Sequence, residues 1–385
     1  MKKTDLAGWL RSNRAALLVL LAALVIFIAA RAFVAPEKAA PSTAGDYVEY
    51  DNAKVVEILS DSTEADESSD GAFRGEQMLT AEVTTGQYKG ETLLVNNHVG
   101  PLYGVPLKAG DSCTLTVSTY ENGDVRADVY EYDRSTPLLI VVGLFLLVTV
   151  LVGGKTGAKS LIGLVFTVLC VFLLLVPALL KGAATLPTTF LLCAYVAAVS
   201  FVLLGGVQKK TVCALLGTIA GMALALIFAL LAQGLLRING LRSADVEPLL
   251  QLRQTGTPIG LRGLLAAGVI ISALGAVMDV AMSLSSALSE VRSADPTMDR
   301  KALFRSGMNI GRDMVGTMTN TLILAFLGSG LVLILYLYSL GLSRHMLMSS
   351  AYLSWELVGG ISSSIGVILS VPITAAICAW AYGKD

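Results

Sequence analysis

The stretch GLLAAGVIISALGAVMDVAMSLSSALSEV, residues 263–291, decides the fold class of this chain. It is long and apolar enough to cross a hydrocarbon core about 30 Å thick, which takes about 20 residues of helix. Asp279 stands near its middle. A carboxylate at that depth costs roughly 2.5–3.5 kcal/mol on insertion scales and usually marks a functional site. The stretch therefore predicts a membrane span with a functional residue inside it.

Asp279 belongs to a row of small and polar residues along this predicted helix. The row advances in steps of three or four residues, so all of its members share one helical face. Its members are Ser272, Gly275, Asp279, Ser283, Ser286 and Glu290. We therefore expect a polar face at membrane depth, with Ser283 and Ser286 close to Asp279.

The composition of the whole chain is that of a polytopic membrane protein. Of the 385 residues, 54% are hydrophobic and 15% are charged, and the mean hydropathy is +0.70. A soluble globular chain has about 25% charged residues. The net charge of −1 and the absence of a long basic tract exclude a nucleic-acid partner. The partner that the composition implies is a lipid bilayer.

Eight apolar segments are candidates for membrane-spanning helices. The first, residues 15–30, follows a basic flank and is expected to be an uncleaved signal anchor, with a cleaved signal peptide as the alternative. Seven more are expected at about 137–152, 160–180, 188–206, 211–235, 264–288, 317–339 and 357–382. Lys and Arg residues are more frequent in the loops on one side of these spans, among them 153–159 and 289–316. The positive-inside rule therefore predicts that both termini are cytoplasmic.

Residues 36–135 differ from the rest of the chain, because they are polar and carry alternating apolar residues. Period-two alternation is typical of short antiparallel strands, and Gly and Asn-Gly positions supply the turns. Five strands are expected, in AKVVEIL (53–59), EQMLTAEVTT (76–85), ETLLVNN (91–97), CTLTVSTY (113–120) and DVRADVYEY (124–132), with turns at Gly86, Gly90, Gly110 and Asn122-Gly123. These strands predict a small extracytoplasmic barrel of OB or SH3-like type. The domains are then 1–35, 36–135 and 136–385.

The segment DPTMDRKALFRSGMNIGRDMVGTMTNT, residues 295–321, follows the Asp279 span. Asp295-Pro296 is expected to begin a helix, since proline suits the first helical turn. Apolar and basic residues then alternate as in a helix that lies on the cytoplasmic interface. Gly307, Gly311 and Gly316 permit either a bend or a close backbone approach. The alternative is a charged, solvated loop.

Polar side chains continue from this segment into the last two spans. Asn309 and Asp313 are four residues apart and can face a ligand together, and Thr317 and Asn320 extend their face. Asn320 is costly at membrane depth unless it is paired, so it is a natural partner for Asp279 or a substrate. The last span carries the row Glu356, Gly359, Ser363, Gly366, Ser370 and Thr374, with Pro372 expected to bend the helix. Three such rows indicate either tight helix packing or a shared polar cavity, and their ionisable groups favour the cavity.

Motifs of enzymes and metal centres are missing from the sequence. It contains no HExxH, no GxSxG and no paired carboxylates with a credible metal geometry. Gly154-Lys155-Thr156 lacks the first glycine and the preceding strand of a P-loop. The five cysteines and two histidines show no metal-ligand spacing. We therefore expect no catalytic residue, no cofactor and no metal.

Two motifs around Asp279 resemble the YibE/F-like family of bacterial multi-pass membrane proteins. They are ALGAVMDVAMSLSSAL from Ala273 and SGMNIGRDMVGTMTNTLILAF from Ser306, and the YKGE turn at residues 88–91 and the region from Glu356 agree with them. The resemblance covers most of the chain and implies a protein of the bacterial cytoplasmic membrane, without implying an activity. The family pattern continues with a proline after LILAF, whereas this chain has GSGLVLIL. That departure puts a kink in the seventh span in doubt.

Two functions of different classes fit these observations. The first is a secondary transporter or permease for an unknown small solute or ion, with its pathway among the last three spans and a glycine bend at 307–316 as a cytoplasmic gate. Asp279 is then the ion- or proton-responsive group, and the other pathway candidates are Ser283, Ser286, Asn309, Asp313, Thr317, Asn320 and Glu356. The second is a non-transporting scaffold whose outer β-domain binds an envelope protein. The transporter requires Asp279 to line a cavity shared with the last two spans.

Overall fold

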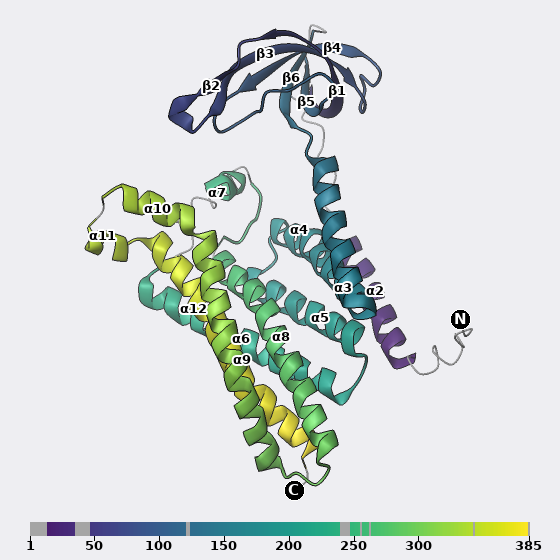
Figure 1. Cartoon of the computed structure of the whole chain (residues 1–385), viewed down its shortest axis with the longest axis vertical. Coiled ribbons are helices and arrows are strands. Elements are labelled where there is room, and N and C mark those ends of the chain that lie inside the picture. The colour runs from purple at the N-terminus through teal and green to yellow at the C-terminus, as the bar shows by residue number, and fades with distance from the viewer. Residues whose placement is uncertain are drawn as a thin grey trace. The chain divides into compact units, whose positions relative to one another are not determined.

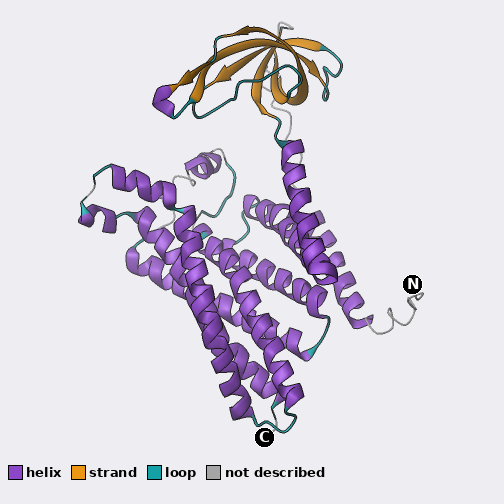
Figure 2. Ribbon diagram, viewed as in Figure 1, coloured by secondary structure: helices purple, strands orange, loops and turns teal. Residues whose placement is uncertain are grey.

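The computed structural model describes residues 14–34, 47–120, 124–238, 247–254, 256–261, 263–341 and 343–383. The chain divides into two compact units, Met1–Ala35 with Val152–Asp385 and Pro36–Leu151. The first unit is helical, and the second contains the strands together with the start of one long helix (Figures 1 and 2). The predicted Asn122-Gly123 turn lies outside the described residues.

Six strands build the β unit. They are β1 (Tyr47–Asp61), β2 (Glu64–Asp66), β3 (Ala72–Val83), β4 (Thr92–Val99), β5 (Ser112–Thr119) and β6 (Val125–Tyr132). The pairing runs β1-β5-β6-β4-β3 and returns from β3 to β1, which closes a five-stranded barrel. Only β4 and β6 pair in parallel among these strands. The five predicted strands are confirmed as β1, β3, β4, β5 and β6, and the short β2 adds to them.

The barrel interior follows from the alternation in the sequence. Every second residue of a strand points to the same face, and these positions hold the buried residues Val55, Leu79, Val95, Leu115 and Val117. The turn glycines at positions 86, 90 and 110 adopt φ of 76°, 89° and 93°, which side chains with a Cβ rarely adopt. Alternation and turn chemistry together therefore account for the barrel.

Two buried amide side chains, Gln77 and Asn97, interrupt this apolar interior. Gln77 Oε1 accepts hydrogen bonds from Asn97 Nδ2 and from the backbone N–H of Leu107, both at 2.8 Å. Gln77 Nε2 donates to Leu107 O at 3.2 Å, and Asn97 Nδ2 donates to Val105 O at 3.0 Å. These bonds hold the segment after β4 against the barrel, so Gln77 connects two strands and a loop.

Cys113 is expected to resist alkylation in the native protein. Its side chain is fully buried in the barrel, and this burial, with Asp111 and Asp133 nearby, raises the pKa of its thiol to about 11. The reactive thiolate is therefore both scarce and inaccessible at neutral pH. Peptide mass spectrometry after iodoacetamide treatment at pH 8 should find Cys113 labelled only when denaturant is present. Labelling of the native protein at the rate of an unfolded control would contradict this expectation.

The helical unit and the long helix that enters it contain eleven described α-helices and one π-helical turn. They are α2 (Arg14–Val34), α3 (Ser135–Cys170), η2 (Val171–Leu175), α4 (Val176–Leu180), α5 (Thr185–Gly205), α6 (Lys209–Leu236), α7 (Glu247–Gln254), α8 (Leu264–Ala294), α9 (Arg300–Ser329), α10 (Leu331–Ser339), α11 (Arg344–Met348) and α12 (Ala351–Tyr382). Five of the described helical runs are long and apolar enough to cross a membrane, and α9 with α10 makes a sixth when this bent pair is one span. The chain is therefore a multi-pass membrane protein.

The loop predicted between the second and third spans is almost absent. Ser135–Leu180 is one helical run, and only Gly154 has a non-helical conformation, with φ 53° and ψ −136°. Glycine adopts a positive φ at little cost, so Gly154 alone interrupts the run. The other residues of GGKTGAK are helical. Gly154-Lys155-Thr156 lies at this interruption, with no strand before it.

The helices α6, α8 and α9 all pack on α12, and we call these four helices the central bundle (Figure 1). A methyl group added to Gly366 of α12 would lie 2.8 Å from Ala225 Cβ, and one added to Gly221 of α6 would lie 2.9 Å from Ser370 Cβ. Small residues that meet in this way allow membrane helices to approach closely. The members of the α12 row from Gly359 to Thr374 are buried. Over this range the row is a packing seam and not a wall of the expected polar cavity.

The start and shape of α9 differ from expectation. It begins at Arg300, where Asp299 caps it by accepting a hydrogen bond from Ala302 N at 2.8 Å, and not at Asp295-Pro296. It then continues without interruption to Ser329. A methyl group on Gly307 would lie 2.9 Å from Ala375 Cβ, and one on Gly311 would overlap Val371. The glycines therefore give a close approach to α12, and the predicted bend, gate and separate interfacial helix are wrong.

A break of 56° separates α9 from α10, although the chain lacks the proline of the family pattern. Gly330 lies at this break and donates its N–H to Phe326 O at 3.0 Å, while Ile334 N donates to Gly330 O and begins α10. All residues of α10 are at least partly exposed in the single chain. The kink that the missing proline puts in doubt is therefore present. By contrast, α12 is one helix that contains Pro372.

Candidate functional site

Contacts on α12 fix the depth of Asp279 in the central bundle. The hydroxyls of Ser272 and Ser363 form a hydrogen bond of 3.1 Å, and Cys378 Sγ donates to Ser285 Oγ at 3.5 Å. Both contacts join α8 to α12 with an offset of 91 to 93 residues, so the two helices run parallel. The same offset places Asp279 at the level of residues 370–372 of α12.

Contacts on α12 also fix the depth of the polar residues of α9. Gly307 lies beside Ala375 and Gly311 beside Val371, so α9 and α12 run antiparallel. One residue further along α9 therefore corresponds to one residue back along α12. This places Arg312 at the level of residue 370, which is also the level of Asp279.

Two tryptophans of α12 indicate where the membrane lies. Trp355 and Trp380 stand near the two ends of the helix, separated by about 37 Å at 1.5 Å per residue. Tryptophan is enriched at both membrane–water interfaces, so the midplane falls near residues 367–368. Asp279, Arg312 and Asp313 are thus within about 7 Å of the midplane. We call these three residues the midplane charges.

The midplane charges lie on the outer surface of the central bundle. Their side chains are exposed, and no side-chain hydrogen bond or ion pair joins Asp279, Arg312 or Asp313 to another residue among those that the structure describes. Further exposed residues extend the same sides of α8 and α9, namely Gly275, Ser283, Asn309, Gly316, Thr317 and Asn320, and Ser286 is half-buried. We call the midplane charges and these exposed residues the α8–α9 polar face. It contains seven of the eight candidate residues when Ser286 at its edge is included.

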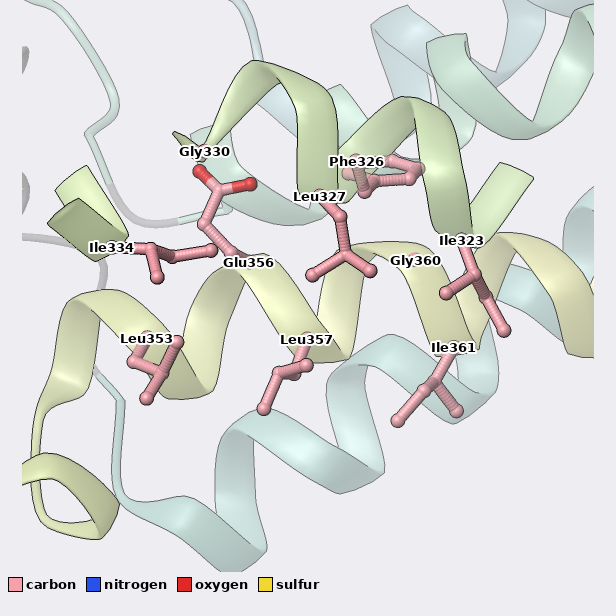
Figure 3. A pocket seen from close by; sticks show the side chains of 10 residues that line it. All are labelled: Ile323, Phe326, Leu327, Gly330, Ile334, Leu353, Glu356, Leu357, Gly360 and Ile361. Carbon is pink, nitrogen blue, oxygen red and sulfur yellow. The ribbon is translucent and has the colours of Figure 1, made fainter. Parts of the chain in front are cut away.

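Glu356 lies elsewhere. It is next to Trp355, about 15 residues above the level of Asp279 on α12, which is about 22 Å along the helix axis. It lines a pocket of about 200 Å³ between α9, α10 and α12, whose other lining residues are all apolar. Figure 3 shows its carboxylate pointing toward Gly330 at the break before α10. The structure therefore does not bring Glu356 together with Asp279 and Asn320 in one patch.

Arg312 is the midplane residue that the sequence did not reveal as a candidate. Its charge suggests a cytoplasmic loop, whereas the structure places it in the middle of a helix that packs on α12. The spacing of Gly307 and Gly311 was the available signal, because two glycines four residues apart are typical of a packed membrane helix. A continuous helix through this spacing carries Arg312 to membrane depth.

The matched family model covers all of the central bundle. Residues 141–384 match the family described as YibE/F-like protein. The chain belongs to the YibE/F-like family. The match includes every candidate residue, and the expected resemblance is confirmed over residues 141–384, which do not include the YKGE turn. No curated protein and no solved structure matches this YibE/F-like chain.

The polar face of this YibE/F-like protein places charged side chains in the low-dielectric interior of the membrane. Two carboxylates and one guanidinium share the middle of the membrane, where ionisable side chains usually bind ions, relay protons or line a solute pathway. Among the described residues, no group of three His, Cys, Asp or Glu side chains lies close enough to hold a metal ion. The face therefore offers charges and hydrogen-bonding groups to a partner from outside the bundle.

Proposed function

We propose that this protein is a secondary transporter or permease for a small polar or charged solute, and that it does not convert the solute chemically. The α8–α9 polar face forms one wall of the pathway. The observation that supports this function is the set of exposed midplane charges, each without a partner among the described residues. An ionised side chain at the bilayer centre costs roughly 2.5–3.5 kcal/mol. A face with three of them must meet water, solute or protein.

The wall lies on the surface of the central bundle and not inside it. Asp279 is exposed on α8, and the pocket that contains Glu356 does not include it. Asp279 therefore does not line the pocket between the last two spans, contrary to the expectation from the sequence, and the site that we propose is the exposed face instead. Asp279 remains the ion- or proton-responsive group, with Asp313 and Arg312 at nearly the same depth.

Asp279→Asn is expected to lower solute-driven proton flux at least about tenfold, a change of about 1.4 kcal/mol in the barrier. Proteoliposomes with entrapped pyranine are challenged in turn with inorganic ions, amino acids and organic acids, and the internal pH is recorded. Glu290→Gln is the matched control, because Glu290 is exposed on the same row of α8 but lies near the C-terminal end of the helix. The control should keep the flux of the wild-type protein.

Two results of this assay would contradict the proposed role of Asp279. The first is an unchanged flux in Asp279→Asn at unchanged thermal stability. The second is a fall in thermal stability alone, which would assign Asp279 to helix packing. Absence of flux with every solute in the wild-type protein would contradict transport itself.

We further propose eight spans in a bacterial cytoplasmic membrane, with both termini cytoplasmic. The run Ser135–Leu180 is about 69 Å long at 1.5 Å per residue, more than twice the hydrocarbon thickness, so its interruption at Gly154 separates two spans. The Trp380 end of the central bundle carries a cluster of cations, namely Lys209, Lys210, Arg292, Arg300 and Lys301. The positive-inside rule favours the cytoplasm for this end. The helix α2 then serves as the signal anchor.

One observation favours the alternative of a scaffold whose outer β-domain binds an envelope protein. Tyr50 and Tyr130 are 63% and 62% exposed, and their rings meet edge to face with centroids 5.1 Å apart. They border an open pocket of about 430 Å³ together with Tyr132 and Arg134. Exposed aromatic residues and arginine are enriched where proteins bind each other. In an OB-type barrel, which we propose from the parallel pairing of β4 and β6, such a surface is available to a partner.

A further inference from the structure

We propose that a second copy of the chain covers the α8–α9 polar face. In this dimer, Asp279 of each copy pairs with Arg312 of the other copy across a two-fold axis that runs along the membrane normal. The inference goes beyond the proposed function, because the dimer is defined by its contacts whether or not a solute passes along them.

The need for a partner follows from the charges. Asp279 and Arg312 have opposite charge, both are exposed, and no ion pair joins them to each other or to another described residue of the same chain. A charge at membrane depth is usually paired or faces a water-filled cavity. Two opposite charges on the exposed sides of neighbouring helices allow a second copy to satisfy both, since a two-fold interface brings each group to its counterpart twice.

The depths of these two groups match what a symmetric dimer requires. A two-fold axis along the membrane normal leaves the depth of every residue unchanged, so only groups at the same level can pair across it. Asp279 lies at the level of residues 370–372 of α12 and Arg312 at the level of residue 370. The difference is within about 3 Å along the helix axis, which the long arginine side chain spans.

A second pair of residues matches in the same register. Gly275 lies four residues before Asp279 and Gly316 four residues after Arg312, so both are at the level of about residue 367. Both are exposed, and a methyl group on either would have no neighbour within 4 Å. Helices α8 and α9 run in opposite directions, so α8 of one copy and α9 of the other pair antiparallel in this register. Two facing glycines allow membrane helices to approach closely.

The remaining polar residues suit the same interface. Asn309 and Asn320 each offer a donor and an acceptor on the exposed side of α9, and Thr317, whose hydroxyl donates to Met314 O at 3.1 Å, offers an acceptor. Hydrogen bonds between such side chains contribute to helix association in membranes. A second copy that pairs the midplane charges therefore also places these groups against protein, and it supplies the second wall that the proposed pathway lacks in one chain.

Disulfide cross-linking in membranes tests the pairing. Two differently tagged copies of the full chain are co-expressed, one with Gly275→Cys and the other with Gly316→Cys, and are treated with copper phenanthroline. The five native cysteines are buried and serve as the background in both copies. We expect a cross-linked dimer that carries both tags. The same result is expected for Asp279→Cys with Arg312→Cys, and the glycine pair keeps the test valid if loss of the charges prevents folding.

The matched control uses another face of the bundle at a similar depth. Ile227 of α6 is 52% exposed and lies two residues after Ala225, which contacts Gly366 of α12. Ile227→Cys combined with Gly316→Cys should give no cross-link. Cross-linking of the glycine pair at or below the level of this control, in protein that elutes as a folded species, would overturn the proposal.

Charge reversal in the full chain provides a second test of the dimer. Asp279→Arg and Arg312→Asp, each alone, are expected to weaken association more than about tenfold in nanodiscs. The double variant Asp279→Arg/Arg312→Asp restores opposite charges in the same register and should recover the dimer fraction measured by mass photometry. A monomeric wild-type protein in nanodiscs, together with no cross-link between the glycine variants, would refute the dimer. It would not refute transport, which the proton-flux assay tests separately.

Discussion

Gly221→Leu will prevent the central bundle from assembling, or will destabilise it by at least about 3 kcal/mol, the upper end of overpacking effects. Gly221 lies where α6 meets both α8 and α12. The first carbon of a side chain there would lie 2.7 Å from Val277 Cγ1, 2.9 Å from Ser370 Cβ and 3.1 Å from Gly366 O. The neighbours are themselves buried, and one of them is backbone, so they cannot move aside. Gly221→Ala should show a smaller loss of about 1–3 kcal/mol.

The matched control for this experiment lies on the same helix. A methyl group on Gly234 would have no neighbour within 4 Å, so Gly234→Leu should fold. Leucine also has a better helix propensity than glycine, so the stability of this variant should not fall. Thermal unfolding of the purified variants, followed by size-exclusion chromatography in detergent, measures both effects. Equal stability of Gly221→Leu and Gly234→Leu would show that the seam between α6 and α12 is wider than the structure has it.

Gln77→Ala will loosen the β-barrel by about 3–5 kcal/mol, because it combines a cavity with lost hydrogen bonds. Gln77 is 1% exposed and bonds to Asn97 Nδ2 and to both the N–H and the C=O of Leu107. Its removal leaves the Leu107 N–H and part of the Asn97 amide buried without partners. A buried donor or acceptor without a partner costs about 1–3 kcal/mol.

Hydrogen exchange in the full chain measures this effect directly. Amides of β3 and β4 should exchange much faster in Gln77→Ala, together with those near Leu107. Glu76→Ala is the control, because the neighbouring Glu76 side chain is 73% exposed and, among the residues that the structure describes, bonds only to the exposed side chain of His98. Protection that is the same in both variants would mean that apolar packing alone holds the barrel.

The patterns in the sequence predicted those parts of the fold that depend on local periodicity. The five barrel strands follow from period-two alternation, and the long apolar helices follow from their length and composition. The inward positions of Gln77 and Asn97 do not follow from such a pattern. Their amides replace apolar residues at buried positions, and they are tolerated because Leu107 and Val105, distant in the sequence, satisfy them.

The contacts of the candidate site could not be predicted from the sequence. Gly307 and Gly311 are compatible with a bend or with packing, and only the contact with Val371 and Ala375 decides between them. That contact brings Arg312 to the midplane, although its charge favours a loop. Small and polar rows on α8 and α12 look alike in the sequence, but one is exposed and the other sealed against α6. Which neighbour a face meets is a property of tertiary packing.

The nine-residue helix α10 has a consequence for how the chain sits among lipids. Leu331–Ser339 is about 13 Å long, less than half of a hydrocarbon core about 30 Å thick. Several of its apolar and aromatic side chains are exposed, among them Val332 at 80% and Tyr338 at 78%. It follows Gly330, which lies beside Glu356 and therefore near Trp355 at one membrane–water interface. Tyrosine is enriched at that level, so α10 lies at this interface and not across a leaflet. The two leaflets therefore meet different cross-sections of the same protein.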